Sequence, residues 1–249
     1  MNRTPSPTRQ TPFDVRLEWG LIGVQALQDC PTFIIVDVLS FSTTVCTACD
    51  DGIPVYPYPS HGHGAANYAK QVEATLAGRR GSAISLSPST MRKGMGAIVL
   101  PSPNGSTIAF EADGQGQVLL GCLRNRTAVA RRAVELGGPF ALIPAGERWP
   151  DGSLRPAFED LIGAGAIAEM LPGRRSPEAE AAVASFKVAE PRLVDALTTC
   201  SSGTELTERG FTADVMHAAR IDVSMAAPLL SNRAFRAGED SGPNADVRK

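Results

Sequence analysis

Asp37 follows four apolar residues and precedes a cluster of hydroxyl side chains. The segment from Ile34 to Thr44 reads IIVDVLSFSTT, and an apolar-periodic stretch follows it. An apolar run without polar alternation predicts an inner strand of a helix-covered sheet, and a Ser/Thr cluster predicts a helix start. Asp37 is therefore expected at the carboxyl end of a strand, the edge at which open α/β sheets bind ligands.

The helix expected after Asp37 offers free backbone N–H groups and the hydroxyls of Ser42 and Thr43, which together favour an anion. A carboxylate beside an anion site needs a cation between them, and a divalent metal is the simplest choice. We therefore expect Asp37, a metal and a phosphoryl oxygen to form one unit. The alternative is an Asp that only caps a βα loop.

Three later strand ends repeat this pattern of a strand, a small polar turn and a helix. Strands are expected over residues 97–100, 118–120 and 140–143, and polar residues follow each one. The candidate substrate-binding and catalytic residues at these ends are Asn104, Gly105, Ser106, Arg124, Asn125, Glu147 and Arg148. Asn104 can donate to a bound anion or orient a water, although an Asx turn would also explain it.

Glu159 and Asp160 lie in the first turn of a helix expected over residues 156–170. The macrodipole alone favours acids there. However, the small residues 164–166 make this helix slim enough to lie tightly on the sheet, which would bring its N-terminus near Asp37 and Glu147. We expect Asp37, Glu159 and Asp160 to be the metal ligands, and oxygen-only ligands favour Mg²⁺ or Mn²⁺ over zinc.

Several other residue clusters permit two interpretations. Arg79 and Arg80 suit a planar oxyanion, or form a solvated charged loop. His61 and His63, flanked by glycines, could bind a metal or phosphate, or belong to a surface turn. The five cysteines are too scattered for a disulfide framework, and the CxxC pair at Cys46 is better explained by two buried thiols than by a redox site.

Composition limits the possible partners and the compartment. The chain has 249 residues, 43% of them hydrophobic, and a formal charge of -2, so it lacks the basic field that nucleic acid requires. No apolar stretch reaches the length of a membrane span, and the N-terminus lacks a signal-peptide core, so we expect a cytoplasmic protein. A homodimer is one possibility for its assembly.

The chain divides into three parts. Residues 1–12 are expected to be a flexible lead, residues 13–236 a single α/β domain, and residues 237–249 a flexible tail. A helix is expected over residues 65–76, prolines push the strand at 53–58 toward an edge, and residues 176–230 are expected to be covering helices and a last apolar segment. His217 is expected to be packed or at the surface.

Acids and anion sites at one sheet edge indicate metal-assisted phosphate chemistry. The chain contains neither GxGxxG after a strand nor GxxxxGK[ST], so the expected ligand is a small phosphorylated acid rather than a nucleotide.

Four strings, VDVLSFSTT, LPSPNGST, GCLRN and PAGERWPDGSLRPAFEDLIGAGAI, resemble in order the motifs of the 2-phosphosulfolactate phosphatases, the ComB family. The resemblance spans Phe33 to Leu230. It implies a magnesium-dependent phosphatase that hydrolyses 2-phospho-3-sulfolactate to sulfolactate and phosphate, and a three-layer α/β/α fold with a mostly parallel or mixed sheet.

Three positions depart from the family pattern. Ser40 stands where arginine is usual, Gly78-Arg79-Arg80 stands near the usual Gly-Glu-Arg, and Ser102-Pro103 replaces Thr-Thr before Asn-Gly. An anion-binding arginine is thus missing from the first loop. One of Arg79, Arg80, Arg148 or Arg155 could replace it, or the substrate could be a different phosphoester.

The hypothesis is that Mg²⁺, held by Asp37 and one or both of Glu159 and Asp160, binds a phosphoryl oxygen. Glu147 would orient a water or protonate the leaving alkoxide, and Asp37 could instead attack phosphorus directly. The donors to the phosphoryl oxygens would be Ser42, Thr43, Asn104 and the backbone near Gly105 and Asn125. The rival hypotheses are a non-catalytic metabolite-binding protein and a CxxC thiol oxidoreductase.

Overall fold

The computed structural model describes residues 6–237. Within that range nine strands form one sheet, and two short strands form a separate ribbon. In spatial order the sheet consists of β1 (Val15–Leu17), β7 (Phe140–Pro144), β2 (Thr32–Val36), β6 (Gln117–Gly121), β10 (Pro228–Ser231), β11 (Ala234–Ala237), β3 (Val55–Tyr58), β5 (Ile98–Pro101) and β4 (Thr75–Leu76). The ribbon pairs β8 (Glu147–Arg148) with β9 (Leu154–Arg155).

The sheet consists of two parallel blocks joined by an antiparallel hairpin. Strands β1, β7, β2 and β6 are mutually parallel, with Ile34 opposite both Leu142 and Leu119. Strands β3, β5 and β4 form the second parallel block. The hairpin of β10 and β11 lies between the blocks and is antiparallel to β6 and to β3. The sheet is therefore mixed, which is one of the two forms expected.

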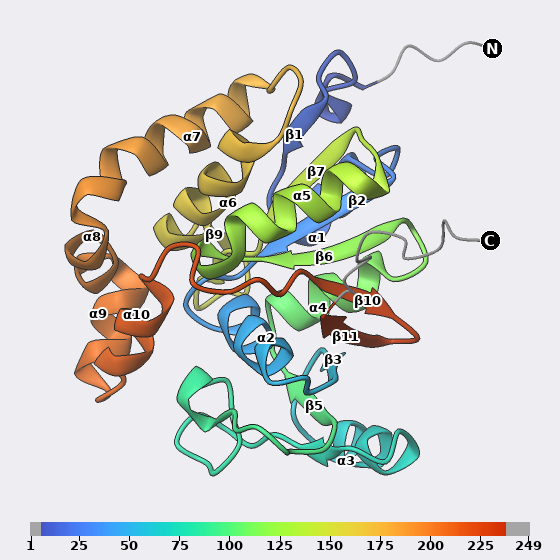
Figure 1. The fold of residues 1–249 in the computed structure, drawn as a ribbon, viewed down its shortest axis with the longest axis vertical. Helices are drawn as coiled ribbons and strands as arrows, with labels where there is room; N and C mark the ends of the chain where they lie inside the picture. Colours follow the sequence, from blue (N-terminus) through green and yellow to red (C-terminus); the bar gives the residue numbers. More distant parts are fainter. Residues whose placement is uncertain (1–5, 238–249) are drawn as a thin grey trace, which may run out of the picture.

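Helices cover both faces of the first block, and so the molecule has three layers (Figure 1). The helices are α1 (Gly20–Ala26), α2 (Phe41–Asp50), α3 (His63–Gln71), α4 (Gly105–Ala112), α5 (Arg126–Leu136), α6 (Phe158–Met170), α7 (Pro177–Ala189), α8 (Leu193–Thr199), α9 (Ser201–Glu208) and α10 (Thr212–Ala218). Residues of α5 to α10 belong to one hydrophobic cluster, and residues of α1, α2 and α4 belong to the other.

The two clusters explain why the strand before Asp37 has no polar alternation. Side chains alternate across a strand, so Ile34 and Val36 join the cluster on one face while Phe33 and Ile35 join the cluster on the other. All four are fully buried. A strand with helices on both faces has no solvent-facing side, and therefore needs apolar residues at every position.

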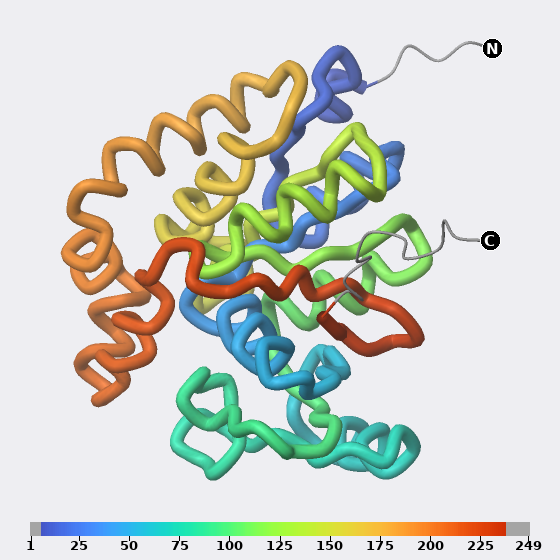
Figure 2. Tube along the Cα trace, viewed as in Figure 1, coloured from blue at the N-terminus to red at the C-terminus, as the bar shows by residue number. Residues whose placement is uncertain are grey.

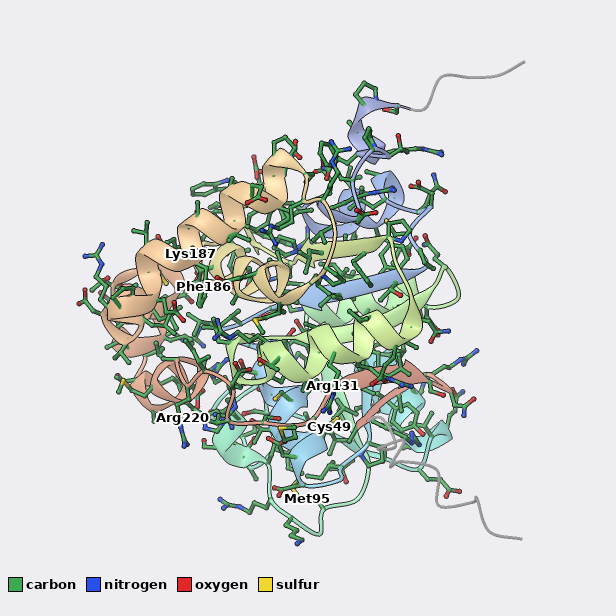
Figure 3. The ribbon with its side chains drawn as sticks, turned by 45° about the horizontal axis from the view of Figure 1, so that its top comes forward. Cys49, Met95, Arg131, Phe186, Lys187 and Arg220 are labelled. Atoms are coloured by element: carbon green, nitrogen blue, oxygen red, sulfur yellow. The ribbon has the colours of Figure 1, made fainter. Side chains whose placement is uncertain are left out.

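Helix α6 approaches β2 closely because position 163 is glycine. A Cβ at Gly163 would lie 2.5 Å from a methyl carbon of Val38 and 2.9 Å from one of Val36. The expectation of a slim helix on the sheet is confirmed at Gly163, whereas Gly165, one of the small residues named for it, faces the backbone of α7 at Ala182. The close approach at Gly163 brings the start of α6 to the end of β2. Farther out, α7 directs Phe186 into the core and exposes Lys187, the two neighbours labelled in Figure 3.

Most predicted elements are present, but three details differ. The helix predicted over residues 65–76 ends at Gln71, because Thr75 and Leu76 pair with β5 as strand β4. Strand β3 is inside the sheet despite its prolines, although it pairs with β11 only between Val55 and Phe235. The last apolar segment enters the sheet as β10 instead of only covering it, and Figure 2 shows this C-terminal segment crossing the molecule beside the chain of β6.

The two ends of the chain fall partly outside the described residues. In the predicted N-terminal lead, residues 7–9 form a 3-10 helix. Gln10 is buried and exchanges hydrogen bonds with the backbone of Leu17 in β1, its Nε2 donating at 2.9 Å and its Oε1 accepting at 3.1 Å. Residues 1–5 of the lead and residues 238–249 of the predicted tail lie outside the described range.

The position of the C-terminal hairpin can be tested at Phe235. Its ring is fully buried and meets the ring of Phe41 edge-on, with centroids 6.1 Å apart. We expect Phe235→Ala to lower the free energy of unfolding by about 3 to 5 kcal/mol, the usual effect of removing a buried phenyl ring. Val188→Ala, at a side chain that is 71% exposed, serves as the control. Equal stabilities of the two variants in denaturant titrations would contradict a core position for the hairpin.

Candidate active site

The carboxylate of Asp37 joins the starts of two helices. Its Oδ1 accepts the backbone N–H of Phe41 at the start of α2 (3.1 Å), and its Oδ2 accepts that of Gly105 at the start of α4 (3.0 Å). These N–H groups have no partner within their own helices, and each helix dipole favours a negative charge there. The anion site predicted at these helix starts is thus occupied by Asp37 itself, and the Gly105 N–H is not free for a substrate.

Asp160 ties three segments together from the first turn of α6. Its Oδ1 accepts the N–H of Val38 after β2 at 2.7 Å, and its Oδ2 accepts the N–H of Gly146 after β7 at 2.9 Å. Asp160 and Asp37 therefore meet at the same end of β2, as predicted from the slim helix. Both side chains are buried, at 3% and 6% exposure respectively.

Glu147 and Asn104 form the third polar contact of the site. The Nδ2 of Asn104 donates to Oε2 of Glu147 at 2.9 Å, which connects the loop after β5 to the strand after β7. Glu159 completes the group of acids: it is buried beside Asp160, and its Oε2 accepts from Sγ of Cys200 at 3.5 Å. Residues from four junctions thus converge at one place.

Burial of these acids changes their ionisation. It raises the pKa of Asp37 to about 6, with a further increase from Glu159, although the N–H groups of Phe41 and Gly105 oppose the change. Burial also raises the pKa of Glu147 to about 7, aided by repulsion from Asp37 and Glu159. The pKa of Asp160 is raised by burial and by the same two neighbours. The acids therefore repel one another, and a bound cation would relieve that repulsion.

A cavity of about 320 Å³ opens beside these acids. Glu147 and Asn104 line it together with Ser102, Pro103, Leu39 and Ser40, and the rest of the wall comes mainly from the loop at residues 79–86 and from α9. The wall carries Arg79, Arg80 and Arg209. The cavity thus places carboxylates and guanidinium groups around one small volume.

Three contacts of Arg80 were not predicted from the sequence. Its Nη1 forms an ion pair with Asp214 of α10, and its Nη2 donates to the carbonyl of Leu39 at 3.3 Å and to Oγ of Ser40 at 3.4 Å. Ser87 Oγ donates to Oδ1 of Asp214 at 2.6 Å. In the sequence, the two adjacent arginines indicated Arg80 as a candidate site residue. Nothing beyond its place at a helix start indicated Asp214.

Four side chains that were predicted to bind substrate form hydrogen bonds with backbone groups instead of lining the cavity. Ser42 Oγ accepts the N–H of Asp37 (3.0 Å), and Thr43 Oγ1 donates to the carbonyl of Val38 (2.6 Å). Ser106 Oγ donates to the carbonyl of Leu100 at 2.7 Å. The amide of Asn125 binds the backbone of Cys122, Leu120 and Ala226. Their polar groups fix the loops that carry the acids.

The remaining candidates divide between the cavity and other places. Arg79 and His61 line the cavity. Arg148 is exposed and donates to the carbonyls of Gly152 and Pro103, beside a neighbouring apolar hollow. Arg124 is buried and donates to the carbonyl of His217 at 3.0 Å, outside the cavity lining. His217 is half-buried, and its Nε2 is 2.9 Å from Thr47 Oγ1.

The CxxC pair consists of buried thiols, as predicted. Cys46 and Cys49 are at most 3% exposed, and Figure 3 shows Cys49 on α2. Burial raises the pKa of Cys49 to about 12, and the pKa of Cys46 is also raised, first by its contact with Cys122. Since the thiolate is the reactive form, neither residue has the environment of a redox cysteine.

The acid cluster fits a magnesium ion in charge and in donor type. Among residues 6–237 no group of three or more His, Cys, Asp or Glu side chains is arranged to hold a metal by itself. Mg²⁺ does not require such a group, because it usually binds one or two carboxylates and completes its shell with water and substrate oxygens. Asp37 with Glu159 or Asp160 would supply those carboxylates.

Comparisons with known proteins agree on one family. The family model described as 2-phosphosulpholactate phosphatase matches residues 21–233. A probable 2-phosphosulfolactate phosphatase of Thermus thermophilus is 29% identical over 240 residues, which cover 90% of this chain and 98% of that protein. The 2-phosphosulfolactate phosphatase of Methanothermobacter thermautotrophicus is 30% identical over 203 residues, which cover 79% of this chain and 85% of that protein.

The described part of the chain contains no helix with both the length and the apolar character needed to cross a bilayer.

The close contact between Gly105 and Asp37 leads to a stability prediction. A Cβ at Gly105 would lie 2.6 Å from Oδ2 of Asp37 and 2.7 Å from the ring of Phe41. We expect Gly105→Ala to lower the free energy of unfolding by about 1 to 3 kcal/mol, because the backbone must shift away from the carboxylate. Gly96→Ala, at a position with open space around it, is the matched control. A loss of less than about 0.5 kcal/mol in Gly105→Ala would contradict the close contact.

The raised pKa of Glu147 predicts how stability depends on pH. Its folded pKa of about 7 exceeds the ordinary value of 4.5, so between these values the folded state binds more protons than the unfolded state. The resulting decrease in the free energy of unfolding is absent below about pH 4.5, grows as pH rises, and is complete above about pH 7. We expect Glu147→Gln to be more stable than the wild type at pH 8, by about 2 kcal/mol after screening, and equally stable at pH 4.5.

Denaturant titrations of both proteins without divalent metal, at the two pH values, measure this difference. Asn104 can still donate to the amide oxygen of the glutamine side chain in Glu147→Gln, so the contact at this position is kept. A variant that is less stable than the wild type at pH 8 would show that Glu147 is not destabilised by its surroundings.

Proposed function

The chain belongs to the 2-phosphosulpholactate phosphatase family, and from this membership and the geometry of the site we propose that it is a Mg²⁺-dependent phosphatase of a small phosphorylated acid. The proposed substrate is 2-phosphosulfolactate, which would be hydrolysed to sulfolactate and phosphate. This is the activity in the name of the Methanothermobacter thermautotrophicus relative. A cytoplasmic location and a homodimer remain predictions.

The observation that carries this proposal is a group of buried acids at one end of β2, next to an acid that lines the cavity. Backbone N–H groups hold Asp37 and Asp160 in place, and Glu147 lines the cavity with a pKa that burial and its acidic neighbours raise to about 7. Buried carboxylates that favour a cation, beside a carboxyl group that keeps its proton to higher pH than usual, can serve as a charged group and a proton donor. Phosphate ester hydrolysis needs both.

Asp37, with Glu159 or Asp160, would hold the metal. When bound there, Mg²⁺ would supply positive charge to the phosphoryl oxygens. Asp37 is suited to a fixed position, because the N–H groups of Phe41 and Gly105 hold both of its oxygens. The same two bonds draw electron density from the oxygens, so we assign Asp37 to binding rather than to attack on phosphorus.

Glu147 would act on the leaving group. It lines the cavity, and Asn104 orients it through the bond to Oε2. In the proposed step, water attacks phosphorus, the bond from phosphorus to the ester oxygen breaks, and the proton of Glu147 passes to that oxygen. A proton of the attacking water then returns to Glu147, so the products are the alcohol and hydrogen phosphate.

Phosphate release from 2-phosphosulfolactate tests the proposal. We expect release with Mg²⁺, and a loss of at least about 100-fold when the metal is removed by a chelator or when Asp37 is replaced in Asp37→Asn. Glu208→Gln, at an exposed acid, is the matched control and should keep full activity. Circular dichroism checks that both variants fold.

Four outcomes would contradict the proposal in different ways. Full activity in the presence of a chelator would show that hydrolysis needs no metal. An active Asp37→Asn variant would show that hydrolysis does not depend on Asp37. Binding of 2-phosphosulfolactate without release of phosphate would favour a non-catalytic binding protein. Phosphate that stays covalently bound to the wild-type chain after denaturation would show that a side chain, with Asp37 as the candidate, attacks phosphorus instead of water.

A further inference from the structure

Three arginines, together with Glu205, line the same cavity as Glu147 and Asn104, and this part of the lining is called the wall below. Arg79 and Arg80 come from the loop after β4, and Arg209 follows α9, so two segments far apart in the sequence supply three guanidinium groups. Asn104 and Glu147 lie at the acid side of the same cavity. At about 320 Å³ the cavity suits a small metabolite, which would contact both sides at once.

Arg80 serves as the fixed part of this wall. The ion pair with Asp214 offsets its charge, and its guanidinium carbon lies 5.3 Å from the centre of the Phe211 ring. Its bonds to Leu39 and Ser40 connect the wall to the loop that carries Asp37. Because Arg80 already has a buried anionic partner, it positions the wall and contributes little net charge to a ligand.

Arg209 keeps a charge that a ligand can use. It lies 5.8 Å from the centre of the same Phe211 ring, and its Nη1 donates to Oε1 of Glu205 at 3.1 Å. The two side chains are 53% and 64% exposed. An exposed pair of this kind contributes little stability, so Arg209 can exchange Glu205 for a substrate anion at small cost.

Arg79 supplies the surplus positive charge. Within residues 6–237 its side chain makes neither an ion pair nor a hydrogen bond, unlike its neighbour Arg80. Its backbone is held nonetheless, because its carbonyl accepts the N–H of Ser82 at 2.9 Å and the N–H of Gly78 donates to the carbonyl of Ile84 at 2.8 Å. Arg79 is therefore a fixed position with a free guanidinium group at the cavity.

We propose that Arg79 and Arg209 bind a second oxyanion group of the substrate, and so select phosphate monoesters that carry another strong anion. This inference rests on the proposed function, because it assumes that the phosphoryl group lies at the acid side of the cavity. A guanidinium group suits a sulfonate or carboxylate, since its donors form a planar fork. A phosphate ester without a second anion would leave this wall unused.

The test compares three substrates that differ in one anion at a time. 2-Phosphosulfolactate has a sulfonate and a carboxylate, 2-phospholactate lacks the sulfonate, and isopropyl phosphate lacks both. We expect Arg79→Gln, Arg209→Gln and the double variant to lower kcat/KM for 2-phosphosulfolactate by about tenfold or more, mainly through KM. For isopropyl phosphate the same variants should stay within about twofold of the wild type.

The matched control is Arg131→Gln. Arg131 is an exposed arginine on α5, labelled in Figure 3, and does not line the cavity. It should leave all three values of kcat/KM unchanged. The result with 2-phospholactate tells which group binds to the wall. If the arginine variants also lower kcat/KM for 2-phospholactate, the carboxylate is bound there. If they leave it unchanged, the sulfonate is bound there.

A binding measurement separates this inference from the proposed function. Calorimetry with 3-sulfolactate needs no turnover, and we expect the double variant to bind it about tenfold more weakly than the wild type and the Arg131→Gln control. If the wild type hydrolyses none of the substrates, the proposed function fails, yet a weakened sulfolactate affinity would still support the arginine wall. An equal loss for all three substrates, or an unchanged affinity in the double variant, would overturn the inference.

Discussion

The structure depends on one carboxylate that closes two helix starts. Asp37 accepts the backbone N–H groups of Phe41 and Gly105, at the starts of α2 and α4. One side chain thus joins the two parallel blocks of the sheet, because α2 follows β2 and α4 follows β5. The same bonds stabilise a negative charge in a buried place, and this lets an acid stay ionised near neutral pH where burial alone would keep it protonated.

The other acids gather around this point, and their repulsion determines what the site can do. Asp160 binds the backbone of Val38 and Gly146, so it holds two loops in place while adding negative charge beside Asp37. Burial, together with repulsion from Asp37 and Glu159, raises the pKa of Glu147 to about 7. Without a cation, the repulsion within this cluster destabilises the fold, so the cluster favours a bound metal. The cluster also keeps a proton donor. Phosphate ester hydrolysis requires both properties.

The C-terminal part of the chain completes both the sheet and the cavity. The β10 and β11 hairpin joins the two parallel blocks, and Phe235 packs on Phe41 next to Asp37. Helices α9 and α10 bring Arg209 and Asp214 to the loop that carries Arg79 and Arg80. The proposed substrate selection and the support of the Asp37 loop therefore depend on the same wall.

The sequence by itself determined the local features: the strand before Asp37, the acids in the first turn of α6 and the polar turns after each strand. These follow from apolar runs and helix-start residues, which act over a few positions. Only the tertiary structure decided that Asp37 fills the expected anion site, that Ser42, Thr43, Ser106 and Asn125 bind backbone, and that Arg80 pairs with Asp214. Those outcomes depend on residues up to 134 positions apart, whose distances a local pattern does not contain.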